Sequence, residues 1–503
     1  MTITNLQPQY AAHPNTAVME RLLKDASVQT IFCGGLCASS ASLFSSVLVK
    51  QDVCPFVFVL GDLEEAGYFY HDLTQVLGTE KVFFFPSSFR RSIKYGQKDA
   101  ANEILRTEVL SRLQKGEEGL CIVTYPDALA EKVVSRKELS DKTLKLNVGE
   151  KLDTTFITDV LHSYGFEYVD YVYEPGQYAV RGSIIDVFSF ASEYPYRIDF
   201  FGDEVESIRT FEVESQLSRE RKEGVAIVPD LAVTGDVTTS FLDFIPKETV
   251  LAMRDFLWLR ERIQVVHDEA LTPQAIAVQE AEENGGITLE GKLIDGSEFT
   301  VRALDFRRME FGNKPTGTPD AKISFHTSVQ PIFHKNFDLV AGSFKDYLEQ
   351  GYSLYICSDS TKQTDRIRAI FEDRGDKIQF TPVVRTIHEG FVDHTLHLCI
   401  FTDHQLFDRF HKYNLKSDKA RSGKVALSLK ELNQFTPGDY VVHTDHGIGR
   451  FSGLVRIPNG DTTQEVLKLV FQNEDVVFVS IHSLHKVSKY KGCLLYTSPS
   501  PRD

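Results

Sequence analysis

Short apolar runs alternate with helical patterns along residues 1–145. VQTIFC (28–33) and FVFVLG (56–61) have the character of buried strands. Further along, apolar residues recur at helical spacing: Ile104, Leu105, Val109 and Leu113. GLCIVTYPDALAEKVV (119–134) reads as a strand, a turn and a helix. Strands that alternate with helices predict an α/β sheet with mostly parallel strand order.

The pattern changes at about residue 146. A helix is predicted over 153–164, with Asp153 as its N-cap and one apolar face formed by Ile157, Val160, Leu161 and Tyr164. Five strand-like segments follow: YVDYVYE (168–174), QYAVRG (177–182), SIIDVFSF (183–190), YRIDFF (196–201) and EVESIRTFEV (204–213). Gly202-Asp203 between the last two is a turn signal. This region is predicted to be a small α+β module with an antiparallel sheet.

Helical and strand-like patterns both occur over 228–335. They comprise a long helical stretch, DFLWLRERIQVVHDEAL (255–271), and two strand-like segments, ITLEG (287–291) and KISFH (322–326). A further α/β unit is predicted over 336–412, built from LYICSD (354–359), a helix through RIRAIFEDRG (366–375) and LHLCIFTD (396–403). After a connector rich in Lys and Ser (412–432), the chain from Pro437 to about residue 489 consists of short strands, the pattern of a small barrel.

Composition limits the function classes. The chain has 503 residues, 42% of them hydrophobic and 25% charged, as expected for several globular domains. Its formal net charge of −16 argues against a body that coats nucleic acid and leaves docking onto proteins open. The apolar runs are too short to span a membrane, and the N-terminus lacks a secretory signal. Seven scattered cysteines suit free thiols in a reducing compartment, so we expect a cytoplasmic protein.

One segment has the layout of a phosphate-binding loop. IFCGGLCASSASLFSSVL (31–48) reads as a strand, a Gly-rich turn and a helix. A functional loop of this kind needs a Lys at the end of the turn and a neighbouring Ser or Thr for Mg²⁺. No Lys or Arg lies between Lys24 and Lys50. We therefore expect an ordinary strand–helix turn and no bound nucleotide.

Three other patterns favour ordinary structural roles. HDEAL (267–271) resembles the acidic box of a helicase, but helical spacing continues into it, which predicts solvated helix residues for Asp268 and Glu269. A metal site is not expected from the histidines near the C-terminus, which are His443, His446, His482 and His485. The basic connector lacks the interleaved aromatic residues of a nucleic-acid-binding segment. No catalytic set stands out, and a binding platform is indicated.

Two stretches carry a resemblance to a known family. PGQYAVRGSIIDVFSF and PYRIDFFGDEVESIRTFEVESQLS, within 175–218, resemble the module shared by UvrB and the bacterial transcription-repair coupling factors. PGDYVVHTDHGIGRFSGL (437–454) resembles the CarD-like RNA-polymerase-interacting domain of those coupling factors. Both motifs in this order point to the coupling-factor family, and the resemblance extends from about residue 15 to Gly492.

The resemblance implies a multi-domain α/β organisation. It comprises a UvrB-like helicase-type domain with a degenerate phosphate loop (1–142, continued at 226–335), an inserted UvrA-binding α+β module (143–225), a small α/β domain without an assigned role (336–412), a linker (413–433), a CarD-like SH3/Tudor-like barrel that binds RNA polymerase (434–492) and a non-native tail (493–503). The implied function is to recruit UvrA to polymerase stalled at DNA lesions, in nucleotide excision repair.

Family positions that contact UvrA map onto Arg181, Arg197 and Phe201. Strand alternation separately places Arg197 and Phe201 on one face, opposite Ile198 and Phe200, so both are expected to point outward. An exposed Arg beside an aromatic residue is typical of an interface anchor. The alternative is an intramolecular ion pair of the arginines with Asp186, Asp199 or Glu204.

The polymerase β subunit would pair with a strand edge of the C-terminal barrel. The resemblance places this contact in the strand and loop after Gly453, including Leu454 and Ile457.

In the coupling-factor family, two helicase-like domains follow the barrel, hydrolyse ATP with Mg²⁺ and move along DNA. A further domain then masks the UvrA-binding face. This sequence contains none of these three domains. We therefore expect a chain without ATPase activity, cofactor or metal, and we expect it to be a monomer. The parent protein would contact DNA mainly through the missing domains. CLLYTSPSPRD (493–503) resembles a translated sequencing adapter and is expected not to fold, which indicates a truncated gene product. The alternatives are a standalone UvrB-like ATPase or helicase and a CarD-like transcription regulator.

Overall fold

The computed structural model of the chain divides into two compact units. One comprises Met1–Leu144 and Ile227–Leu415, and the other Lys145–Ala226 and Lys416–Asp503. The residues that the structure describes are 1–88, 100–213, 215–231, 238–272, 275, 289, 291–411, 438–443, 446–459, 462–471, 475–480 and 487–489. The predicted linker (413–433), the predicted tail (493–503) and most of ITLEG lie outside these ranges.

A seven-stranded parallel sheet forms the centre of the first unit. Its strands, in order across the sheet, are β17 (Ala321–Ser324), β1 (Thr30–Gly34), β16 (Arg307–Gly312), β15 (Val250–Met253), β2 (Phe56–Val59), β4 (Cys121–Thr124) and β3 (Val82–Phe84). Parallel sheets are covered on both faces, so their strands are continuous apolar runs. All residues of β2 and β15 are buried, which confirms the parallel α/β prediction.

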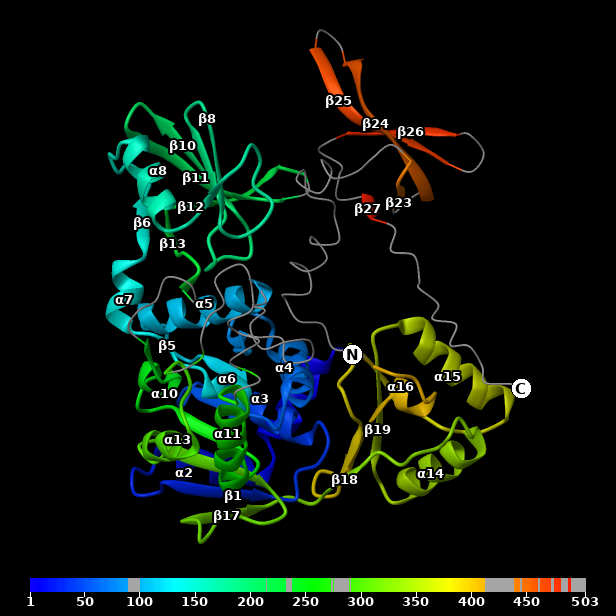
Figure 1. Ribbon diagram of the computed structural model, residues 1–503. Helices are drawn as coiled ribbons and strands as arrows, with labels where there is room; N and C mark the ends of the chain where they lie inside the picture. Colours follow the sequence, from blue (N-terminus) through cyan, green and yellow to red (C-terminus); the bar gives the residue numbers. More distant parts are fainter. Residues whose placement is uncertain are drawn as a thin grey trace, which may run out of the picture. The chain divides into compact units, whose positions relative to one another are not determined.

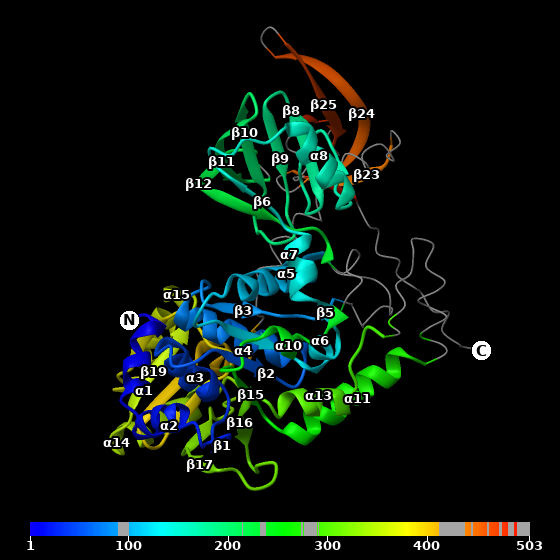
Figure 2. The ribbon, with the colours of Figure 1, turned by 90° about the vertical axis from the view of Figure 1, so that its left-hand side faces the viewer.

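Helices cover both faces of this sheet (Figures 1 and 2). In Figure 2 the strands pass between α2 and α3 on one side and α11 and α13 on the other. The main helices of the unit are α1 (Gln7–Ala11), α2 (Pro14–Lys24), α3 (Ser40–Lys50), α4 (Leu63–Leu77), α5 (Ala100–Lys115), α11 (Phe256–Ala270) and α13 (Gly296–Ala303). Shorter elements complete it: η1 (Ile3–Asn5), α6 (Pro126–Ala130), β5 (Val133–Val134), α7 (Arg136–Asp141), β14 (Thr238–Thr239) and α10 (Phe241–Phe244).

A smaller mixed sheet belongs to the same unit. Its strand order is β18 (Thr327–Val329), β21 (Phe391–Asp393), β22 (Leu398–Thr402), β19 (Ser353–Ser358) and β20 (Thr381–Val384). Its helices are α14 (Phe337–Glu349), α15 (Thr361–Asp373) and the short α16 (Asp403–Leu406). Phe344, Phe371 and Phe401 lie in its core. We call residues 327–411 the second lobe.

The inserted module contains a six-stranded sheet and one helix. Its strand order is β12 (Ser218–Lys222), β11 (Glu204–Phe211), β10 (Tyr196–Phe201), β9 (Ile184–Val187), β8 (Gln177–Arg181) and β7 (Glu167–Tyr168). The helix is α8 (Thr154–Ser163), and β6 (Leu144–Asn147) pairs with β13 (Gly224–Ile227). The predicted helix is confirmed, because Asp153 caps α8 by accepting the Thr155 N–H while Ile157 and Leu161 are buried.

The strand predicted over YVDYVYE (168–174) is mostly wrong. Only Glu167–Tyr168 pair in the sheet, as β7, and the following residues leave it. Val169 and Val172 instead pack on Phe211 and Ala179, on one face of the sheet. Residues that favour strands, such as Val and Tyr, also suit a segment that covers a sheet, which is why the composition did not distinguish the two.

The C-terminal region forms a five-stranded antiparallel sheet. Its strand order is β26 (Val476–Ser480), β25 (Thr462–Val470), β24 (Gly447–Asn459), β23 (Tyr440–His443) and β27 (Val487–Lys489). Val441, Leu467 and Val479 contribute to its core. The prediction of a strand-rich C-terminal region is confirmed as an antiparallel sheet, but β24 with 13 residues and β25 with nine are longer than the predicted short strands. Strands β26 and β27 are the outer strands of this sheet, and its closure into a barrel stays a prediction.

Two further observations bear on the composition. In the part of the chain that the structure describes, no helix is both long and apolar enough to cross a bilayer. The six described cysteines are unpaired, as their scattered positions predicted.

Candidate protein-interaction sites

A buried carboxylate lies at the centre of the inserted module. Asp186 on β9 is fully buried. Strand register places it directly opposite Ala179 on β8 and Arg197 on β10. A buried carboxylate is stable only when charged or polar partners surround it. The register therefore sets where these partners must come from.

Arg197 is the principal partner of Asp186. Its Nε and Nη2 atoms donate to the two carboxylate oxygens at 2.8 and 2.9 Å, which is a bidentate arrangement. Its Nη1 donates to the carbonyl of Gln216 at 3.1 Å, and the guanidinium lies 4.4 Å from the ring centre of Phe211. Only 14% of the side chain is exposed. Arg197 is therefore committed to contacts inside the module.

Arg181 is the second partner of the same carboxylate. Its Nη2 donates to Asp186 Oδ2, and its guanidinium lies 5.0 Å from the ring centre of Tyr171. This side chain is 35% exposed, so part of the guanidinium is accessible to solvent. Of the two arginines, Arg181 keeps more capacity for an external contact.

The sequence prediction that Arg197 points outward is wrong for most of its side chain. Alternation along β10 holds, since Ile198 and Phe200 are buried on the opposite face. The Arg197 face is nevertheless covered, because Gln216 bonds to Arg197 and also reaches the carbonyls of Val172 and Val213. The intramolecular pair with Asp186, which was the alternative, is present. Whether either arginine contacts UvrA stays a prediction.

Phe201 has the exposure expected of an interface anchor. It is the last residue of β10, it precedes the Gly202-Asp203 turn, and its side chain is 79% exposed. Gly202 has a φ of +62°, which suits a tight turn at this position. Burial of such a ring in a partner would add a large apolar contact. The contact of Phe201 with UvrA stays a prediction.

The C-terminal sheet presents the two residues predicted to contact polymerase on its longest strand. Leu454 pairs with Leu467 just after a register shift in β24, and its side chain is 41% exposed. Gly453 next to it has a φ of +115°. The backbone of Ile457 pairs with Gln464, while its side chain is outside the described part. Sequence reasoning missed Val476 and Phe478, which are exposed on the outer strand β26.

The Gly-rich turn after β1 has the amide of Cys37 engaged by protein groups. Cys37 N–H donates to the hydroxyls of Ser40, at 2.9 Å, and Thr327, at 3.1 Å. Gly35 has a φ of +85° and lies against the carbonyl of Phe325. A phosphate-binding turn needs free amides as well as a Lys. These contacts support the prediction of a structural turn.

The acidic HDEAL segment lies on a helix, and two of the four C-terminal histidines are among the described residues. Phe256, Leu259, Ile263 and Val266 are buried along α11, and Asp268 is exposed near its end, which confirms the solvated-helix interpretation. The rings of His443 and His446 are 4.7 Å apart, while His482 and His485 are outside the described residues. Within the described ranges, no three His, Cys, Asp or Glu side chains are grouped so as to hold a metal.

Comparisons with known proteins assign both interaction regions to a class. Residues 144–232 match the UvrB interaction domain family, and residues 435–491 match the CarD-like/TRCF RID domain family. The chain therefore carries two domains that are each defined by protein interaction.

Relatives that match 91% or 92% of this chain include transcription-repair-coupling factors. The chain is 24% identical to that of Staphylococcus aureus (strain bovine RF122 / ET3-1), over 91% of its own length and 45% of the relative's. It is 23% identical to that of Staphylococcus haemolyticus (strain JCSC1435), over 92% and 45%. The resemblance to coupling factors found in the sequence is confirmed. The chain spans less than half the length of these relatives.

Proposed function

We propose that this chain couples transcription to nucleotide excision repair. It binds RNA polymerase through residues 435–491 and UvrA through residues 144–232. The observation that carries the proposal is the presence, in one chain, of a UvrB interaction domain and a CarD-like/TRCF RID domain. Similarity to transcription-repair-coupling factors over 91% of the chain supports it.

In this proposal Phe201 anchors UvrA and Leu454 contacts the polymerase β subunit. Phe201 is the more exposed of the two, with 79% of the residue accessible against 41% for Leu454. Arg181 adds its exposed part to the UvrA contact, while Arg197 supports the interface by holding Asp186. Leu454 lies beside an irregularity in β24, a place where sheets often change direction.

The seven-stranded sheet acts as a scaffold and not as a motor in this proposal. Its Gly-rich turn lacks a Lys, and its Cys37 amide is already engaged. The ATP-driven movement of a full-length coupling factor along DNA is assigned to the part of the relatives that this chain does not span. A standalone ATPase would need the charge that is missing from this turn.

A bridging experiment tests the function. Immobilised polymerase β subunit should retain UvrA only after the purified chain is added. Phe201→Ala should abolish retention of UvrA but not of the chain, and Leu454→Ala should abolish retention of both. Phe156→Ala and Ile448→Ala are matched controls, because both side chains are exposed in the same two regions. Equal UvrA retention with and without the chain would refute the proposal.

A further inference from the structure

The loop between β20 and β21, residues 386–390, lies where the second lobe meets the seven-stranded sheet. Both belong to the same compact unit. The loop follows Arg385, whose φ of +76° is rare for a residue with a side chain. Such a conformation persists only where its surroundings hold it in place.

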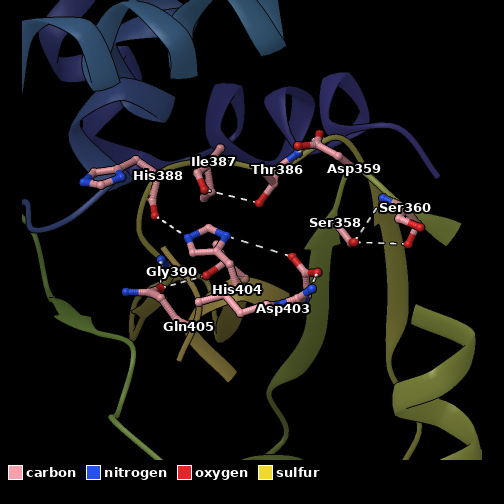
Figure 3. A network of polar contacts seen from close by, with 12 residues as sticks. Ser358, Asp359, Ser360, Thr386, Ile387, His388, Gly390, Asp403, His404 and Gln405 are labelled. Atoms are coloured by element: carbon pink, nitrogen blue, oxygen red, sulfur yellow. Dashed lines mark hydrogen bonds and ion pairs between the residues drawn. The ribbon is translucent and has the colours of Figure 1, made fainter. Parts of the chain in front are cut away.

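Residues of the second lobe form hydrogen bonds with the backbone of this loop. Asp359 Oδ1 accepts the Thr386 N–H at 3.1 Å, and Gln405 Oε1 accepts the Gly390 N–H at 2.7 Å. His404 Nε2 donates to the carbonyl of His388 at 2.8 Å (Figure 3). These contacts fix both ends and the middle of the loop within its own lobe.

Residues next to the seven-stranded sheet, on α4 and just before α3, contact the same loop. Asp72 on α4 accepts the His388 N–H at 2.8 Å. Ser39 Oγ accepts the Glu389 N–H at 3.0 Å, and the Ser39 N–H points back to the Glu389 carbonyl at 3.4 Å. The Tyr68 ring stacks on the His388 imidazole with centres 3.4 Å apart. Two loop amides therefore donate to the second lobe, and two donate to residues next to the seven-stranded sheet.

One of these residues, Ser39, lies where ligands bind in folds of this kind, while Tyr68 and Asp72 lie within α4. Ser39 immediately precedes α3, directly after the Gly-rich turn that follows β1. In open parallel sheets, ligands bind beyond the carboxyl ends of the strands, with anions at helix N-termini. Thr327 of the second lobe also bonds to the Cys37 amide in this turn. Partial burial raises the pKa of the Glu389 carboxyl and the nearby carboxylates of Asp72 and Glu65 also raise it, while Arg254 lowers it.

We propose that the 386–390 loop is an intramolecular occupant of this ligand-binding edge, held in the place of a phosphate-bearing ligand. The second lobe thereby closes the edge of the seven-stranded sheet and is joined to it as one unit. This gives a role to a lobe that neither interaction domain requires, and it does not depend on the proposed coupling function.

Hydrogen exchange on the full chain tests this inference. In the double variant Ser39→Ala/His388→Ala, the amides of 37–42 and of 386–390 should both exchange about tenfold faster, since one hydrogen bond and one ring stack are lost. Lys345→Ala, which breaks an exposed pair with Asp376 in the same lobe, is the matched control and should leave 37–42 unchanged. Unchanged exchange at 37–42 in the double variant would overturn the proposal.

Strand β22 reports whether the second lobe stays folded, because its residues are buried. If β22 also loses protection in the double variant, the second lobe has unfolded and the single variant Ser39→Ala is measured instead. This variant removes the hydroxyl that accepts the Glu389 N–H and changes no residue of the second lobe. Faster exchange at Glu389 then supports the inference, and no change refutes it. In the unmodified chain, inorganic tripolyphosphate should leave exchange at 37–42 unaltered. Protection there would show an open anion site and would also refute it.

Discussion

At the scale of single residues, the inserted module shows how one buried charge determines its neighbours. Asp186 is fully buried and is stabilised by two arginines, of which Arg197 makes the bidentate contact. Loss of one partner from a buried ion pair costs more than the pair contributes, because the remaining charge stays desolvated. The two arginines and Phe201 are therefore expected to respond differently to substitution.

Arg197→Ala should destabilise the module by about 3 kcal/mol, because Asp186 would keep only its contact with Arg181. Faster hydrogen exchange of the β9 and β10 amides would measure this loss. Arg209→Ala is the control, since Arg209 forms a partly exposed pair with Asp199 and should cost less than about 1 kcal/mol. Equal losses for the two variants would contradict the account of Asp186.

Phe201→Ala should leave the stability of the module within about 0.5 kcal/mol of the parent, because the ring is largely exposed. The same exchange experiment checks this value. A large loss of stability would mean that the ring packs inside the module, and any loss of UvrA binding could then not be assigned to a direct contact.

At the scale of elements, the turn between β1 and α3 depends on a close backbone approach. An added Cβ at Gly35 would lie 2.1 Å from the carbonyl oxygen of Phe325, and the φ of +85° disfavours any side chain. Phe325 itself donates its N–H to the Gly34 carbonyl at 2.8 Å, so neither segment can move away freely.

Gly35→Ala should therefore destabilise the first unit by about 3 kcal/mol. Gly116→Ala is a matched control in the same unit, with a φ of +71° and open space around the glycine, and it should cost only about 1 kcal/mol. Trp258, the only tryptophan, lies on α11 of this unit and reports its unfolding by fluorescence. Similar costs at the two positions would show that φ alone matters.

The contact between α4 and the second lobe should weaken in acid. Burial lowers the pKa of His388 and His404, and it lowers that of His411 to about 4. His71 and Asp72 face them from α4, while Asp403, Arg409 and Asp359 face them from the second lobe. A histidine with a lowered pKa binds fewer protons when folded than when unfolded, so stability falls as pH falls.

The loss is expected between about pH 6.5, the ordinary value for histidine, and about pH 4. Thermal unfolding of the unmodified chain across this range, followed by Trp258 fluorescence, measures it. His404→Gln, which keeps a donor for the His388 carbonyl, should flatten the pH dependence. A Tm independent of pH over this range would contradict the assignment.

At the scale of the whole chain, local patterns predicted much of the fold and less of the sites. Alternation placed β8 to β11, and helical spacing placed α8 and α11. The burial of Arg197 could not be predicted, because its cover comes from residues beyond β11 and from the segment after β7. The contact of Ser39 with Glu389 joins residues 350 positions apart, and no local pattern contains it. Phe201 was singled out because strand alternation and a family resemblance coincided, and its contact with UvrA stays a prediction.

The last prediction concerns catalysis by the whole chain. Phosphate release from ATP should not exceed background, with or without double-stranded DNA, because the Gly-rich turn lacks its Lys. Ser40→Lys should not restore ATP hydrolysis, because two amides near the turn are already engaged. The Cys37 N–H donates to the Thr327 hydroxyl, and the Ser39 N–H donates to the Glu389 carbonyl. Ser40→Ala controls for loss of the hydroxyl that Cys37 uses. Turnover in Ser40→Lys alone would show that the missing charge is the whole cause of the inactivity, and would contradict the second cause, the occupied edge.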